Sequence, residues 1–331
     1  MISNIKMPKL LGIVMTLFLL IGLVGCSSDS SKKSDKKSSN ESAVTVDTKF
    51  GKVEIKGHPK RVVALGWGDA ETALSLGVEP IGASDWLAFG GDGVGPWIKG
   101  AYKKSPTILG TMELDYEKIA SLKPDLILDV KSSGDEERYK RLSEIAPTVG
   151  VPKGGDNYLT TTTDQVRMIA QALGKVDKGE QLLKDVDVAF DKAAKANPEF
   201  AGKTVAVGAY DSSGFGAYVK GDSRVDFVTR LGFKNKEEIE NLAKGNFFIK
   251  VADEKLDLLN ADLTIVLPIF VDPKEITNNK LYQKIPSVAD GRSIILDTNS
   301  SNAFSTGTVP ALLWAIDNLP QQFKKALEGG A

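Results

Sequence analysis

Cysteine and histidine are almost absent from this sequence of 331 residues, which contains only Cys26 and His58. A single cysteine cannot form a disulfide bond within the chain, so the folded part must be stabilised by its core. A Ser-His-Asp triad or a histidine-ligated metal site would depend on His58 alone, and its place before Pro59 is typical of a surface turn. We therefore expect no catalytic residues and no protein-ligated metal.

An excess of charge is also missing, because 42 Lys and Arg stand against 43 Asp and Glu, a net charge of −1. This balance argues against a nucleic-acid-binding protein. The glycine-rich run 91–96 is not expected to cradle phosphate, since no helix follows it and Pro96 has no amide hydrogen. No pair of carboxylates is singled out for acid–base catalysis, so the sequence does not indicate an enzyme.

The N-terminus has the pattern of a secretory signal, with Lys6 and Lys9 followed by an apolar run from Leu10 to Val24. This run is too short to span a bilayer comfortably. Residues 23–26, Leu-Val-Gly-Cys, resemble a bacterial lipobox, which implies a signal peptide over residues 1–25 and a diacylglyceryl thioether on Cys26. The alternative is an ordinary buried cysteine at the end of a cleaved signal peptide.

Residues 27–43 are nearly all Ser, Lys, Asp, Asn and Glu, too polar to form a core. We predict that residues 26–43 are a lipidated cysteine and a disordered tether. They would hold the folded part on the extracytoplasmic face of the cell membrane. The remaining residues are numerous enough for two domains.

A twelve-residue pattern occurs twice, at 116–127 and at 253–264. Each copy predicts a short helix with a glutamate in its first turn, Glu117 or Glu254, followed by a buried strand. Asp115 would cap the first helix, whereas Ala252 occupies that place in the second copy. The glutamate is present in both copies, whereas the capping aspartate is present in the first alone. The repeated pattern predicts two lobes of similar build.

The lobes are predicted over residues 44–175 and 199–331, each with the alternation of strands and helices typical of α/β structure. The expected elements include a hairpin over 44–55, a helix over 69–76 capped by Asp69, and a closing helix over 309–327. Between the lobes, within 176–198, helical spacing of apolar residues predicts one long helix from 177 to 196, about 30 Å in length.

Aromatic residues and glycines follow strands in both predicted lobes. Ligands of open α/β sheets bind beyond the carboxyl ends of the strands, so Trp67, Lys131 and Tyr210 should converge on a cleft between the lobes. Core packing is the alternative for every aromatic residue; the Gly and Asp neighbours of Trp67 and Trp86 favour the cleft. The remaining candidates, for which both interpretations are equally open, are Trp97, Tyr102, Tyr218 and Phe304.

Several short segments, in this order, resemble the substrate-binding lipoproteins of ABC importers for ferric siderophores, haem or cobalamin. They are 59–65 (Pro-Lys-Arg-Val-Val-Ala-Leu), 71–74, 76–78, 109–111, 117–119, 122–127, 145–148 and 172–174. The resemblance implies two α/β lobes joined by a single long helix, the class III periplasmic-binding-protein fold. It also implies a monomer that delivers its ligand to a permease and its ATPase, with Glu117 and Glu254 pairing with permease arginines.

Within this resemblance a ferric siderophore is the expected ligand, because such a complex needs aromatic walls and complementary charge but no metal ligand or cofactor of the protein. Lys131, Lys220 and Lys250 are the basic candidates, whereas Arg138 and Arg167 are expected on solvated helix faces. No arginine cluster is evident, which argues against citrate-type chelates.

The alternatives are haem, with a tyrosine at 102, 210 or 218 as axial ligand, or cobalamin. From other classes, a lipid-anchored enzyme or an adhesin-like surface module remains open.

Overall fold

The computed structural model describes residues 43–111 and 113–330. The predicted signal peptide, Cys26 and nearly all of the predicted tether lie outside the described residues. Within the described ranges, no helix is both long and apolar enough to cross a membrane.

The first lobe contains a five-stranded parallel sheet in the order β5-β4-β3-β6-β7. The predicted hairpin is present as β1 and β2, which pair antiparallel from Val44 with Ile55 to Thr48 with Gly51. The strands are β1 (Val44–Thr48), β2 (Gly51–Ile55), β3 (Val62–Ala64), β4 (Gly82–Ser84), β5 (Thr107–Leu109), β6 (Leu126–Leu128) and β7 (Thr148–Val149). The helices are α1 (Asp69–Ser75), the 3-10 helix η1 (Pro96–Ile98), α2 (Tyr116–Ser121), α3 (Glu136–Ser143) and α4 (Thr162–Ala172).

The second lobe contains a six-stranded sheet in the order β11-β9-β8-β12-β13, with β10 also paired to β8. Its strands are β8 (Thr204–Asp211), β9 (Gly214–Tyr218), β10 (Lys234–Asn235), β11 (Phe248–Val251), β12 (Leu263–Pro268) and β13 (Ser293–Ile295). Its α-helices are α6 (Ser223–Arg230), α7 (Glu237–Leu242), α8 (Pro273–Thr277), α9 (Pro286–Ala289), α10 (Thr298–Thr306), α11 (Val309–Asn318) and α12 (Pro320–Leu327). Three 3-10 helices complete it: η2 (Pro198–Phe200), η3 (Asp253–Leu259) and η4 (Tyr282–Lys284).

Two strands of this sheet, β9 and β11, run antiparallel to their neighbours and were not expected from the sequence. Glycines at 214 and 216 weaken the strand pattern of β9. Gly216 has a packing reason, because the ring of Phe248 in β11 occupies the space that a Cβ atom would need.

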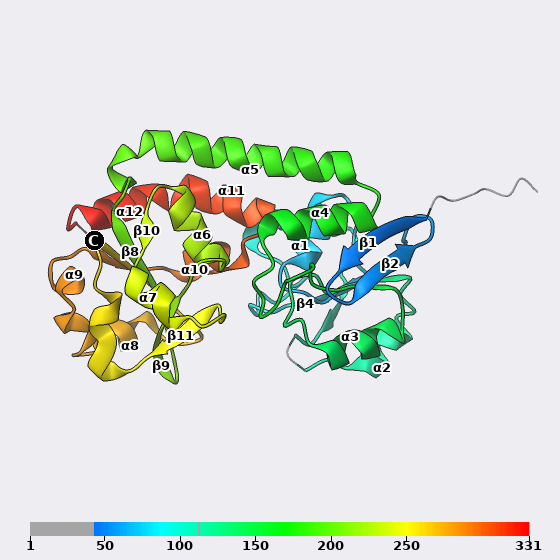
Figure 1. Ribbon diagram of the computed structural model, residues 1–331, viewed down its shortest axis with the longest axis horizontal. Helices are drawn as coiled ribbons and strands as arrows, with labels where there is room; N and C mark the ends of the chain where they lie inside the picture. The colour runs from blue at the N-terminus through cyan, green and yellow to red at the C-terminus, as the bar shows by residue number, and fades with distance from the viewer. Residues whose placement is uncertain (1–42, 112, 331) are drawn as a thin grey trace, which may run out of the picture. The chain divides into compact units, whose positions relative to one another are not determined.

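A single long helix, α5 (Val176–Ala196), connects the lobes and runs along both of them (Figure 1). Its apolar face is buried: Leu183, Val186 and Phe190 belong to the core cluster that contains the sheet of the second lobe. Leu182 packs against the core clusters of both lobes. The predicted fold, two α/β lobes joined by one backbone helix, is confirmed.

Two local predictions were wrong, and one predicted helix differs in type from its repeat. The closing helix is divided into α11 and α12, because Pro320 begins a new helix. Asp69 is not the N-cap of α1; Gly68 takes that place with φ of 76°, and Asp69 is buried inside the helix. The second copy of the repeat is a 3-10 helix with a kink at Lys255, whereas the first is an α-helix that Asp115 caps as predicted.

Candidate functional site

A buried carboxylate, that of Glu71 in α1, joins the two lobes. It accepts hydrogen bonds from the backbone N–H of Gly95 and the indole N–H of Trp97, both at 2.9 Å. It also accepts one from the hydroxyl of Thr308, the N-cap of α11 in the second lobe, at 2.5 Å. Burial raises the pKa of Glu71, and the three hydrogen bonds oppose that rise.

Trp97 therefore lies between the lobes, where it is half-buried. It packs against the core cluster of the second lobe, and its ring centroid lies 6.1 Å from that of Trp314. We call the contacts made by Glu71, Trp97, Lys131 and Thr308 the interlobe seam. Trp97 ties the aromatic loop 86–106 to the second lobe, so it supports the predicted cleft without lining it.

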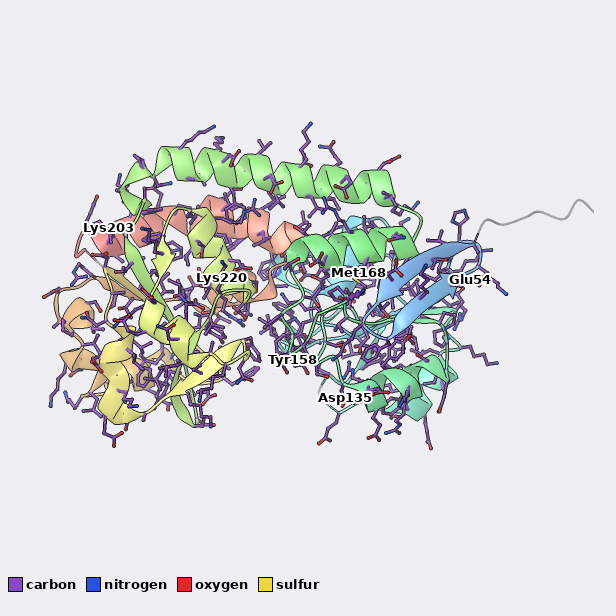
Figure 2. All side chains as sticks on the ribbon, in the orientation of Figure 1. Glu54, Asp135, Tyr158, Met168, Lys203 and Lys220 are labelled. Atoms are coloured by element: carbon purple, nitrogen blue, oxygen red, sulfur yellow. The ribbon has the colours of Figure 1, made fainter. Side chains whose placement is uncertain are left out.

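A stack of aromatic rings lies where the lobes face each other. Trp67 is sandwiched between Trp86, with ring centroids 4.3 Å apart, and Tyr158, at 4.0 Å. Phe247 of the second lobe meets the edges of Trp67 and Tyr158 at 6.2 Å. Figure 2 shows Tyr158 on the side of the first lobe that faces the second. The structure places Trp67 and Trp86, both predicted as ligand contacts, against each other, together with Tyr158 and Phe247, of which the sequence gave no sign.

The indole nitrogen of Trp67 is buried and has no hydrogen-bond partner among the described residues. A buried donor without an acceptor is unfavourable, by about 1–3 kcal/mol in typical proteins. Only an acceptor near the plane of the indole ring, in line with its N–H, could take this hydrogen bond.

Two adjoining cavities lie between the aromatic loop of the first lobe and the second lobe. One, of about 300 Å³, is lined by Leu87, Ala88 and the segment 268–271 at the carboxyl end of β12. The other, of about 540 Å³, lies between the glycine-rich run 90–100 and the start of α10. They share Ala88, Thr298 and Asn302, and we call them together the interlobe cleft. A still larger hollow, of about 780 Å³, is lined by the first lobe alone, so it does not lie in the cleft.

Phe270 at the mouth of this cleft is the most exposed of the large apolar side chains described, at 79%. Its φ of 55° lies in the left-handed region that bulky residues rarely adopt. Strained, exposed aromatic residues of this kind cluster at ligand sites. The sequence places Phe270 directly after a buried strand, the one signal that could have identified it.

The other residues predicted as ligand contacts are more buried than the sequence suggested. Phe304 is fully buried between Phe227 and Phe323, because its side of α10 faces the core, so its prediction as a ligand contact was wrong. Tyr218 is 5% exposed and is covered by the guanidinium of Arg224, 4.0 Å from its ring centroid. Tyr210, beside Phe215, remains half-buried at the end of β8 and Lys131 is buried in the seam.

Arginines near the aromatic stack are bound to carboxylates of their own lobe. Arg138, expected on a solvated face, is half-buried and donates to both oxygens of Asp129 at 3.0 and 2.6 Å. Arg224 donates from a single nitrogen, Nη1, to both oxygens of Asp222 at 3.0 and 2.8 Å. Burial works against the charge of each arginine, but these carboxylates raise both pKa values. Arg167 is exposed as expected and pairs with Glu180 of α5.

A model of the periplasmic binding protein family matches residues 62–299, most of the described chain. The chain belongs to this family. Members of the family are solute-binding proteins, which agrees with a cleft between two lobes.

Two relatives from Bacillus subtilis (strain 168) show the family resemblance along nearly the whole chain. The Fe(3+)-citrate-binding protein YfmC is 27% identical over 308 residues, which cover 89% of this chain and 92% of that protein. The iron(3+)-hydroxamate-binding protein YxeB is 26% identical over 303 residues, which cover 86% and 88%.

Solved structures of periplasmic binding proteins also match. PiaA of Streptococcus pneumoniae TIGR4 in complex with ferrichrome has a TM-score of 0.74 at 25% identity, covering 87% of this chain and all of that one. SirA of Staphylococcus aureus with staphyloferrin B has a TM-score of 0.70 at 28% identity, covering 85% and 98%.

A second buried carboxyl group, that of Asp69, generates a prediction for stability. Its oxygens accept hydrogen bonds from the N–H of Val130 and the side-chain amide of Gln165, both at 2.7 Å. Burial raises its pKa from 3.8 to about 7. Because the folded pKa is the higher one, the contribution of Asp69 to stability is fully present below about pH 4 and decreases as the pH rises to 7.

Asp69→Asn removes this titrating group. The free energy of unfolding of the variant, relative to that of the original protein, should therefore increase as the pH rises from 4.5 to 8, by up to a few kcal/mol. Urea unfolding at several pH values measures this difference. Asp191→Asn, at an exposed position of α5, serves as the control and should show no such trend. A stability difference for Asp69→Asn that does not change with pH would contradict the burial argument.

Proposed function

We propose that this protein is an extracytoplasmic binding protein that captures a ferric siderophore in the interlobe cleft and delivers it to the permease and ATPase of an ABC importer. The observation that carries the proposal is the interlobe cleft with the exposed Phe270 in its lining, together with the aromatic stack of Trp86, Trp67 and Tyr158, in a chain of this family. Relatives that bind iron(3+)-hydroxamate and ferrichrome support it.

The charges around the cleft favour a nearly neutral chelate, such as a ferric hydroxamate. Arg138 and Arg224 already neutralise Asp129 and Asp222, so neither supplies a free cation. An anionic chelate would need uncommitted arginine or lysine donors, but the basic side chain in the lining of the two cleft cavities, Lys99, is accompanied there by the carboxylate of Asp92, and Lys220 and Lys250 are exposed outside that lining. Haem is less favoured, because Tyr102 and Tyr218, two of the three tyrosines predicted as axial ligands, are buried.

We also propose that Cys26 carries the lipid anchor on the outer face of the cell membrane, and that the protein acts as a monomer. Glu117 and Glu254 would dock on the permease. Both glutamates are exposed in the first turn of their helices, and neither carboxylate forms a hydrogen bond or ion pair with another described residue. Each lobe thus presents one glutamate that has no partner among the described residues. Each glutamate could form an ion pair with an arginine on one of two symmetric permease surfaces.

Trp86→Ala should weaken the binding of a ferric hydroxamate by about tenfold or more, since burial of a large apolar side chain is worth roughly 1.5–3 kcal/mol. Quenching of tryptophan fluorescence measures the affinity, with ferric citrate, a ferric catecholate and haem as competing ligands. Trp314→Phe, away from the cleft cavities, is the control and should bind normally. If none of the four ligands changes the fluorescence, the siderophore assignment fails.

Glu117→Arg combined with Glu254→Arg should leave siderophore affinity intact and abolish uptake of iron by cells, because two attractive contacts with the permease become repulsive. Uptake of radioactive iron measures the effect. Glu137→Arg with Glu275→Arg is the matched control, since both are exposed glutamates in the first turn of a helix, one on each lobe. Normal uptake by the first double variant would refute docking through these residues.

A further inference from the structure

A small cavity of about 130 Å³ lies inside the interlobe seam, separate from the cleft that holds the proposed siderophore site. The first lobe contributes Lys131 and the four consecutive threonines 160–163 that lead into α4. The second lobe contributes Ser223, Asp226 and Arg230 from α6, and Phe190 of the connecting helix closes one side. At about 30 Å³ per water, the cavity has room for roughly four waters or one small ion.

Lys131 is the residue that indicates a bound ligand in this cavity. Its side chain is only 5% exposed and reaches across to the second lobe, where a Cβ atom on Gly307 would lie 3.7 Å from its Nζ. Among the described residues, this ammonium group forms no hydrogen bond and no ion pair. Burial lowers the pKa of Lys131, and the nearby Arg224 lowers it further, while Asp222, Asp226 and Asp69 oppose the shift. A buried ammonium without a hydrogen-bond acceptor is unfavourable, so a ligand that supplies acceptors is favoured.

Two helix N-termini add further donors around the same cavity. The amides of Thr162 and Thr163 begin α4, and the amide of Ser223 begins α6; in first turns such groups have no acceptor within the helix. The positive ends of these two helix dipoles therefore border the cavity, whereas Gly307, the C-cap of α10, brings the negative end of a third helix close to Lys131. The donors at the cavity come from both lobes.

The charged groups that face the cavity are not all positive. Arg230 donates to the exposed Asp187 of α5, which partly neutralises it. Asp226 accepts the N–H of Gly221 at 3.0 Å and has its pKa raised by burial. The remaining acid, Asp222, is paired with Arg224. Asp226 is thus the one carboxylate at the cavity without a cationic partner among the described residues.

We propose that this cavity binds a small oxyanion that carries a proton, such as hydrogenphosphate or bicarbonate. The oxygens would accept from Lys131 and from the amides at the starts of α4 and α6, while the O–H of the anion would donate to Asp226. Sulfate has the same charge as hydrogenphosphate but no proton at neutral pH, so it would face Asp226 with an oxygen that cannot donate and should bind less well. An anion held in this way contacts both lobes at once.

Inorganic phosphate is the probe for the test, titrated into the purified full chain in phosphate-free buffer without a siderophore and followed by calorimetry and by the ³¹P line width. The original protein should bind phosphate more tightly than sulfate. Lys131→Met should weaken phosphate binding by about tenfold or more, as expected for loss of a charge-assisted hydrogen bond. Lys284→Met, at an exposed site of the second lobe, is the matched control and should bind phosphate normally.

The variant Asp226→Asn tests whether Asp226 recognises the proton of the anion. A change of preference between two anions cannot come from a general loss of folding. An asparagine can donate to a deprotonated oxygen, so this variant should reverse the preference and bind sulfate at least as tightly as phosphate. The site is refuted if the original protein binds no phosphate at millimolar concentrations, if Lys131→Met binds it normally, or if Asp226→Asn keeps the original preference. Because no siderophore is present, these results are independent of the proposed transport function.

Discussion

The hydrogen bonds to the Glu71 carboxylate are the interaction on which the arrangement of the binding region depends. A carboxylate with 3% exposure is stable only when donors replace the water it has lost, and here the donors come from three places. Gly95 and Trp97 belong to the aromatic loop of the first lobe, and Thr308 belongs to the second lobe. One acidic side chain therefore fixes the loop and the contact between lobes together.

The hydrogen bonds to Glu71 explain how a glycine-rich loop can form a fixed wall of the cleft. Trp86 and Leu87, at the start of the loop, line the aromatic stack and the cleft, while Trp97 is held in the core of the second lobe. The long helix α5 contributes to the cores of both lobes through Leu182. Both features resist a large hinge motion, because rotation of one lobe would break buried contacts.

Much of this could be predicted from local patterns in the sequence. The connecting helix was evident because apolar residues such as Leu183, Val186 and Phe190 follow helical spacing, and the first copy of the repeat was evident from its cap at Asp115. Trp67 and Trp86 could be assigned to the site because small or polar neighbours cannot bury them locally.

The remaining features depend on contacts between residues far apart in the sequence. Asp69 looks like a helix cap, yet its carboxylate binds Val130 and Gln165. Arg138 looks solvated because its helix is polar, but Asp129 lies within reach only after β6 and α3 have packed. Phe304 follows no pattern that separates a core aromatic from a ligand contact, and the strand pattern of β9 is masked by its glycines.

Small-angle X-ray scattering of the protein with and without a saturating ferric hydroxamate tests most directly whether the seam holds the lobes while the cleft binds ligand. The seam and the connecting helix predict binding with nearly superimposable scattering profiles and radii of gyration. A marked decrease in the radius of gyration on binding, as in hinged closure of two lobes, would contradict the account.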